Sequence, residues 1–283
     1  MRYGLEIPIG GECADPHFLA ELAQLAEEAE WDGIFVEDYI CYYTSPNAPT
    51  CDPWVALAGM AVRTERIRLG TTVTPLSRRR PWKLARETVT LDHLSNGRLI
   101  LGVGLGGFGE KSFTHFGEVE DGRQRAEMLD EGLDILAGLW SGQPFTYTGK
   151  HYEVEEVTFL PRPVQSPRIP IWVGGGWPKK GPVRRAAGWD GIVPYKHPEG
   201  GSWQDMTPED VLALREAVES QRSANTPFDI AIGGRERRED WEEERAHIRA
   251  LAEVGVTWWM EQIEAGEREV MREGVRRGPL RIA

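Results

Sequence analysis

The chain has 283 residues, of which 40% are hydrophobic and 28% are charged, a composition that can build one sizeable core. Acidic residues (45) outnumber basic residues (33), so the formal net charge is −12. A surface this acidic repels nucleic-acid phosphates and anionic lipids, and we expect neither as a partner. No apolar run reaches the roughly 18 residues of a membrane span, and the N-terminus shows no signal region. The three cysteines form no C-x-x-C pair, so we expect reduced thiols in a cytoplasmic protein.

Short apolar runs alternate with helical patterns along the whole chain. The candidate strands are residues 3–7, 33–36, 67–73, 98–103, 169–173, 191–193, 228–232 and 256–260. Continuous apolar runs are typical of parallel strands that are buried on both faces. Helix starts are marked by a capping side chain before a proline, at Asp15-Pro16, Asp52-Pro53 and Thr207-Pro208.

Eight strand–helix alternations predict an α/β protein with a single (β/α)8 TIM barrel over residues 1–283. A doubly wound open sheet is the alternative. The first strand disfavours it, because this strand ends in Glu6-Ile7-Pro8 and not in a glycine-rich dinucleotide turn.

The alternation is interrupted before the fifth strand, at about residues 142–168. Residues 145–154 alternate around a glycine turn and predict a hairpin insertion, not a second domain. Later in the chain, the charge-rich residues 236–245 predict a solvated helix start.

In a (β/α)8 barrel the active site is built from the segments that follow the strands. Two of these segments, residues 104–107 and 174–176, are rich in glycine. Glycine lets backbone N–H groups approach a ligand closely, and such a loop before a helix can hold a phosphate. Residues 174–176 precede a helix with Arg184 and Arg185, so they are the phosphate candidate; a tight strand–helix turn is the alternative.

Other chemistries are less well supported. The six histidines are scattered without H-x-H or H-E-x-x-H spacing, so we expect no metal site. Tyr195 and Lys196, after the sixth strand, are candidates for contact with a substrate or an anion. For Lys196 the alternatives are a solvated rim position and a Schiff base as in class I aldolases.

Residues 91–104 (LDHLSNGRLILGVG), preceded by residues 64–71 (TERIRLGT), resemble the luciferase-like monooxygenase family. The resemblance continues through residues 169–176 (IPIWVGGG) and 256–259 and covers nearly the whole chain. The family includes bacterial luciferase, flavin-dependent alkane-sulfonate monooxygenases, and deazaflavin-dependent dehydrogenases and reductases. The resemblance implies a barrel that binds FMN or the deazaflavin coenzyme F420 across its strand ends.

The resemblance also implies positions for the cofactor. The backbone around Thr71, Thr72 and Val73 would lie beside the ring, where deazaflavin members often have a non-proline cis peptide. The ribityl phosphate end would be held by the glycine segments, and aromatic residues would lie near the ring. These positions are Gly104, Gly106, Gly107, Gly174, Gly175, Gly176 and Trp177, and the hairpin insertion would cover the mouth. Because Trp258 and Trp259 are adjacent, at most one of them can point into the barrel.

The second strand departs from the family pattern. Many members have Asp-His after it, whereas this chain has Asp38-Tyr39. A phenol can donate a hydrogen bond, but it cannot replace imidazole as a base near neutral pH without a large pKa shift. Glu110 lies where members often carry an acid near the substrate. Asp38, Tyr39 and Glu110 are the catalytic candidates. Alternatively, Asp38 caps a helix or forms a salt bridge with an arginine at the mouth, Tyr39 packs under the hairpin insertion, and Glu110 is an exposed loop charge.

The three consecutive arginines Arg78, Arg79 and Arg80 could contact an anionic substrate or the acidic tail of F420. A salt-bridge role at the rim is the alternative.

We therefore expect an oxidoreductase acting on a small-molecule substrate. The first hypothesis is a monooxygenase that uses reduced FMN and O2. Because the chain has no dinucleotide fingerprint, we expect a separate flavin reductase to supply the reduced FMN. The alternative is F420-dependent hydride transfer. A non-catalytic flavin-binding protein stays open because the usual histidine is absent. Barrels of this family commonly pair through helices, so we expect a homodimer.

Overall fold

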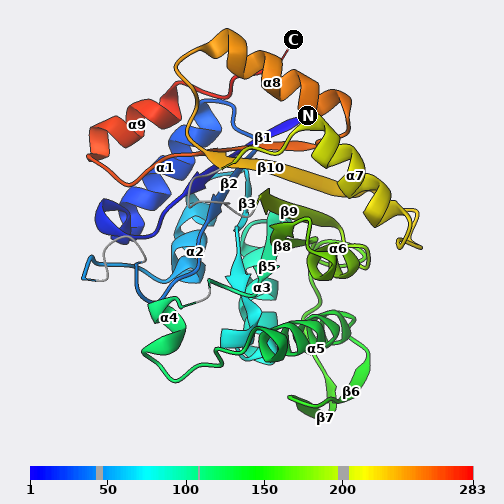
Figure 1. The fold of residues 1–283 in the computed structure, drawn as a ribbon. Coiled ribbons are helices and arrows are strands. Elements are labelled where there is room, and N and C mark those ends of the chain that lie inside the picture. Colours follow the sequence, from blue (N-terminus) through cyan, green and yellow to red (C-terminus); the bar gives the residue numbers. More distant parts are fainter. Residues whose placement is uncertain (43–46, 108, 197–203, 283) are drawn as a thin grey trace.

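Parallel strands close into an eight-position barrel in the computed structural model, which describes residues 1–42, 47–107, 109–196 and 204–282 (Figure 1). In order around the barrel the strands are β1 (Arg2–Ile7), β2 (Gly33–Val36), β3 (Arg68–Thr71), β5 (Leu99–Gly104), β8 (Ile171–Trp177), β9 (Gly191–Lys196), β10 (Asp229–Arg235) and β11 (Trp258–Gln262). The short strand β4 (Thr74–Pro75) continues the β3 position and pairs with β5. The ring closes where Arg2 of β1 lies opposite Trp258 of β11. The predicted (β/α)8 barrel is confirmed.

Helices cover the outside of the barrel. They are α1 (Pro16–Glu28), α2 (Pro53–Arg63), α3 (Pro81–Leu94), α4 (Lys111–Thr114), α5 (Gly122–Trp140), α6 (Lys180–Ala186), α7 (Pro208–Glu219), α8 (Trp241–Glu253) and α9 (Arg268–Arg276), with short 3-10 turns at Gly11–Ala14 and Leu76–Arg78. The predicted caps are confirmed: Asp52 Oδ1 accepts hydrogen bonds from the N–H groups of Trp54 and Val55, and Thr207 forms a capping box with Asp210. Within the described residues, no helix has the length and apolar character needed to cross a membrane.

Two apolar layers hold the barrel together. The smaller one fills its inside and consists of Phe35, Ile100, Trp172, Ala231, Trp258 and Met260. The Phe35 and Trp172 rings stack with centroids 5.3 Å apart, and Trp258 meets Trp172 edge-on at 5.3 Å. The larger layer lies between strands and helices and includes Trp259. Because neighbouring strand residues face opposite sides, Trp258 points inward and Trp259 outward, as predicted.

The predicted hairpin is present as β6 (Pro144–Thr148) and β7 (Glu153–Thr158), which pair antiparallel. It projects beside α5 (Figure 1). The carboxylate of Glu131 on α5 accepts hydrogen bonds from the backbone N–H groups of Lys150, His151 and Tyr152, at 2.8, 3.0 and 3.0 Å. The hairpin turn is therefore tied to the helical layer.

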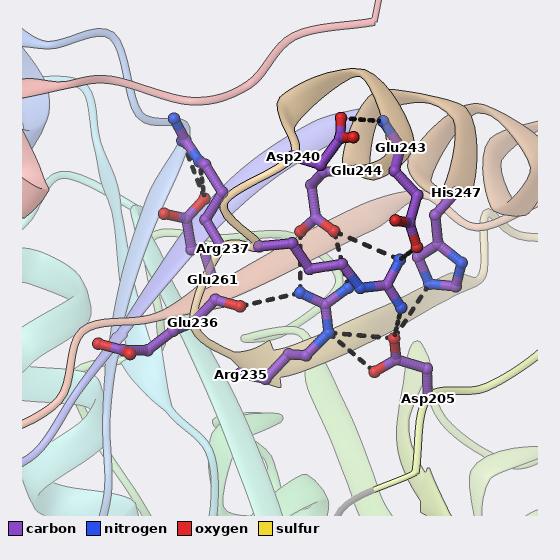
Figure 2. A network of polar contacts seen from close by, with 10 residues as sticks. Asp205, Arg235, Glu236, Arg237, Asp240, Glu243, Glu244, His247 and Glu261 are labelled. Carbon is purple, nitrogen blue, oxygen red and sulfur yellow. Dashed lines mark hydrogen bonds and ion pairs between the residues drawn. The ribbon is translucent and has the colours of Figure 1, made fainter.

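The charge-rich segment 236–245 contains the start of α8, as predicted, and its residues 239–243 are exposed, but Arg237 and Glu244 are buried, which corrects our expectation in part. Figure 2 shows its buried Glu244 held by Arg235, whose Nη1 and Nη2 donate to the two carboxylate oxygens at 2.9 and 2.8 Å. Arg235 Nε also donates to Asp205 in the segment before α7, at 2.8 Å. Arg237 is buried against Glu261, at 2.9 Å. Each guanidinium meets a carboxylate, on α8 and in the segment before α7 for Arg235 and on β11 for Arg237, and this pairing offsets the cost of burial.

Candidate active site

A cavity of about 670 Å³ opens at the carboxyl ends of the barrel strands, and all eight strand positions contribute to its lining. Its walls are largely apolar, formed by residues such as Val73, Leu105, Val193 and Met260. A mostly apolar cleft of this size with a few polar groups is typical of cofactor and small-molecule sites. Its place at the carboxyl ends of the strands is the usual place of the active site in this fold.

The wall between β3 and β4 is formed by Thr72 and Val73, which both line the cavity and are joined by a cis peptide bond. The expected non-proline cis peptide is therefore present. Thr71 lies one position deeper, fully buried, and its Oγ1 donates to the carbonyl of Gly102 at 2.9 Å.

The position of the Val73 side chain accounts for the presence of glycine at two of the predicted positions, Gly104 and Gly174. A Cβ on Gly104 or Gly174 would lie 2.6 or 2.7 Å from the Val73 side chain, so glycine at both positions lets Val73 pack into the wall. Gly104 is outside the residues that line the cavity, whereas Gly106, Gly107 and Gly174 are among them.

Gly174, Gly175 and Gly176 are not a loop, which corrects the sequence interpretation. They belong to β8 and pair in register with Val193, Pro194 and Tyr195 of β9. The strand continues through the glycines because the backbone pairing with β9 continues as far as Lys196. All three glycines still line the cavity, but as part of strand β8.

Three cations line the cavity just after β8. They are Lys179, Arg184 and Arg185, of which Arg185 is buried and ion-paired with Asp130. Lys179 and Arg184 are exposed, and Arg184 lies 3.8 Å from Asp130. Lys179 was missed at the sequence level because it follows the glycines in a short turn without any motif of its own.

Asp38 lines the cavity but is fully engaged by two of the three predicted arginines. Arg79 Nε and Nη2 donate to its two oxygens, each at 2.8 Å, and Arg78 Nη2 donates to Oδ1 at 3.0 Å. The side chains of Asp38 and Arg78 are only 1% and 3% exposed. The Arg79 pKa is raised, since hydrogen bonds and charge from Asp38 outweigh the opposing effect of burial. Arg80 is exposed, lies 6.0 Å from the Trp82 ring, and does not line the cavity.

Carboxyl groups gather at the β1–β2 side of the cavity. Glu6 is the penultimate residue of β1 and Glu37 follows β2, and both line the cavity together with Glu110. Burial raises the pKa of Glu6 to about 7. The pKa of Glu37 is also raised to about 7, by burial first and then by the neighbouring charges of Glu6 and Glu110. Sequence reasoning placed Glu6 and Glu37 at strand ends but did not single them out, because a lone glutamate carries no motif.

Two carboxylate oxygens in this group are buried without a hydrogen-bond partner among the described residues: Glu37 Oε2 and Glu110 Oε1. The second oxygen of Glu110 accepts from the N–H of Gly107 at 3.1 Å, and Oε1 lies 3.8 Å from Arg78 Nη1. The Tyr39 side chain, which also lines the cavity, hydrogen-bonds to Glu37 and opposes the rise of its pKa.

The remaining predicted contacts divide between the cavity and its outside. Tyr195 lines the cavity, and burial raises its pKa. Lys196 does not line the cavity; its Nζ pairs with Asp210 Oδ2 at 2.7 Å. Trp177 also lies outside the lining and donates from Nε1 to Asp210 Oδ1 at 3.3 Å. Asp210 thus holds both side chains against α7.

The hairpin does not cover the mouth, contrary to our expectation. No residue of 142–168 is among those that line the cavity, because Glu131 and Glu127 bind the hairpin turn to α5. Among the described residues, no group of histidine, cysteine, aspartate and glutamate side chains could hold a metal ion.

Fold and cavity together define a (β/α)8 barrel with a candidate active site at the carboxyl ends of its strands. The luciferase-like monooxygenase family model matches residues 6–201, and the chain belongs to this family of oxidoreductases.

One similar protein is the F420-dependent glucose-6-phosphate dehydrogenase of Microbacterium testaceum, which is 33% identical over 181 residues, 63% of this chain and 52% of that protein. The chain thus spans about half the length of this curated relative.

Two solved structures share the fold. The monooxygenase RslO1 from Streptomyces bottropensis is 22% identical with a TM-score of 0.76, over 98% of this chain and 97% of the other. An F420-dependent secondary alcohol dehydrogenase, in complex with an F420-acetone adduct, is 16% identical with a TM-score of 0.77, over 97% and 96%.

Proposed function

We propose that this protein is an F420-dependent oxidoreductase that transfers a hydride between the deazaflavin and a small alcohol or carbonyl substrate. The observation that carries the proposal is Glu37, whose pKa is raised to about 7 and whose Oε2 is buried in the cavity without a partner among the described residues. A carboxyl group that titrates near neutral pH can exchange a proton with a hydroxyl group. The name of the Microbacterium relative supports the choice of cofactor.

The cavity residues fit a flavin-like cofactor. Val73, Leu105 and Met260 offer an apolar wall for a planar ring, and the exposed Lys179 and Arg184 offer positive charge for a phosphate. A Cβ on Gly181, which also lines the cavity, would meet nothing within 4 Å, so the wall beside these cations is open. When bound, the deazaflavin would supply the hydride acceptor or donor.

The chain's own residues would handle the proton and hold the site in shape. In the direction of alcohol oxidation, Glu37 Oε2 would accept the hydroxyl proton of the substrate, and the bound deazaflavin would supply the acceptor for the hydride of its carbon. Tyr39, hydrogen-bonded to Glu37, would hold this carboxyl group in place. Asp38 would act as a positioning residue, because its oxygens bind Arg78 and Arg79. Glu110 Oε1 offers a further acceptor to the substrate.

The first test is a fluorescence titration of the protein with F420, FMN and reduced FMN. We expect F420 to bind most tightly and to be reduced by a small alcohol without oxygen. Oxidation should accelerate as pH rises through about 7, because Glu37 must lose its proton to act as a base. In Glu37→Gln we expect kcat to fall and this pH dependence to disappear, with F420 affinity unchanged.

Other results would favour the other hypotheses. Tight binding of reduced FMN alone, with substrate-dependent oxygen uptake, would replace our proposal by the monooxygenase fed by a separate flavin reductase. Binding without any turnover would favour a non-catalytic flavin-binding protein. The cytoplasmic location and the homodimer stay predictions.

A further inference from the structure

The charges that line the main cavity are divided between two sides. The carboxylates Glu6, Glu37 and Glu110 come from the ends of β1 and β2 and from the segment after β5. The cations Lys179 and Arg184 lie beyond β8. A ligand that spans the cavity therefore meets negative charge at one end and positive charge at the other.

No cation neutralises the pair at the end of β1 and β2. Among the described residues, no ion pair involves Glu6 or Glu37. The nearby arginines are already engaged: Arg79 binds Asp38 through two nitrogens, and Arg78 binds Asp38 at 3.0 Å. On the acidic side, defined as Glu6, Glu37 and Glu110, the one ion pair among the described residues joins Glu110 Oε1 to Arg78 Nη1, at 3.8 Å.

The acidic side also offers two acceptor oxygens that have no hydrogen-bond donor among the described residues. Glu37 Oε2 and Glu110 Oε1 come from different strand ends, are both buried, and belong to side chains that line the same cavity. The Glu110 side chain is only 11% exposed. A buried carboxylate oxygen without a donor is costly, so a ligand that donates a hydrogen bond to it is favoured.

We propose that the acidic side selects substrates that present a hydroxyl or ammonium group to Glu6, Glu37 and Glu110, and rejects substrates that present a phosphate or carboxylate there. This inference rests on the proposed function, since it names the substrate class of the same site. A donor group satisfies the two unpartnered oxygens, whereas a phosphate or carboxylate would bring only further acceptor oxygens to them in a largely apolar cavity. With Lys179 and Arg184 given to the cofactor phosphate, the remaining cation among the described lining residues is Arg185, which is ion-paired with Asp130.

The test uses three probes with one carbon skeleton: 3-aminopropane-1,2-diol, glycerol and glycerol 3-phosphate. Their dissociation constants are measured by saturation-transfer NMR on the protein with and without bound F420. We expect the amino compound to bind most tightly and glycerol 3-phosphate at least about tenfold more weakly. The reason is that gaining or losing one hydrogen bond to a charged group changes a dissociation constant by about this factor.

Variants identify the residues responsible. Glu6→Gln and Glu37→Gln should each reduce the preference for the amino compound several-fold. Glu156→Gln on the exposed face of the hairpin is the matched control and should leave the preference unchanged.

The inference is overturned if glycerol 3-phosphate binds as tightly as the amino compound, if the amino compound shows no saturation transfer, or if both cavity variants keep the full preference. These outcomes are independent of the proposed function, which fails instead when F420 does not bind in the fluorescence titration.

Discussion

Glu37 should make the stability of the protein depend on pH. Its pKa is about 7 in the folded protein against an ordinary value of 4.5, so it keeps a proton that the unfolded chain has lost. The folded state therefore binds more protons between these values, and stability falls as pH rises from about 4.5 to about 7. We expect Glu37→Gln to be more stable than the natural protein by about 2 kcal/mol at about pH 8 and nearly equal at about pH 4.

Urea unfolding at the two pH values measures this difference, with Glu156→Gln as the exposed control. An increase of the same size at both pH values would show that the carboxyl group is not responsible.

Asp38 should matter for stability through the arginines it binds. Replacing it with asparagine removes the nearer carboxylate partner of Arg78, whose side chain is 3% exposed, and leaves it only Glu110, at 3.8 Å. Breaking a buried ion pair from one side costs about 3 kcal/mol or more. We expect Asp38→Asn to lower the free energy of unfolding by this amount, measured with urea. Arg80→Ala, at the exposed member of the same arginine run, should change it by less than about 0.5 kcal/mol. Equal effects of the two substitutions would contradict the assignment.

The sequence indicated several site residues because they follow strands or belong to a family segment. Tyr39, Thr72, Val73 and Glu110 all line the cavity, as their positions suggested. Glu6 and Glu37 could not be ranked in the same way, because their raised pKa values arise from burial and from charges brought together by different strands. Only the folded barrel creates that proximity.

At the level of elements, Glu244 should anchor α8. Both of its oxygens accept hydrogen bonds from Arg235 at the end of β10, and Arg235 also binds Asp205 before α7 (Figure 2). Glu244→Gln should destabilise the protein by about 2 kcal/mol and speed amide exchange at the start of α8. Glu242→Gln, whose side chain is 86% exposed on the same helix, is the control. Unchanged exchange in Glu244→Gln would show that other contacts suffice.

Three of the predicted strands, which correspond to β8, β9 and β10, ended too early. Every one of the eight strands was placed, but β8, β9 and β10 continue about three residues beyond their apolar runs, through Gly174–Trp177 in the case of β8. At these ends the inward side faces the cavity, so glycine, proline and polar residues replace the apolar ones that mark a strand. The apolar pattern that predicts a strand therefore ends where the strand begins to line the cavity.

The whole barrel could be predicted because its strand–helix pattern repeats eight times, and several of the repeats carry a helix cap that the sequence shows, as at Asp15, Asp52 and Thr207. The place of the hairpin could not. Its alternation predicted β6 and β7, but the contact between Glu131 and the backbone of residues 150–152 is long-range and leaves no mark in the pattern. Position relative to the mouth is a tertiary property, and the local pattern does not encode it.

Cofactor binding should stabilise the molecule as one unit. The strands form a closed ring around one interior cluster, so we expect a single cooperative thermal transition. F420 at about 100 times its dissociation constant should add about 2.7 kcal/mol to the free energy of unfolding, because it binds only the folded barrel. Calorimetry across a range of F420 concentrations measures the shift.

The double variant Lys179→Ala and Arg184→Ala should need a higher F420 concentration for the same shift, because it removes both exposed cations at the β8 side of the cavity. Lys180→Ala, which exchanges an exposed lysine next to this pair but outside the cavity lining, controls for the loss of charge alone. If all three proteins gave the same shift at each F420 concentration, the phosphate end of the cofactor would have to lie elsewhere in the cavity. If instead only the double variant needed more F420, the result would fix the orientation of the cofactor in the cavity. The cofactor phosphate would bind at the cationic side, and the carboxylates at the ends of β1 and β2 would remain available to the substrate.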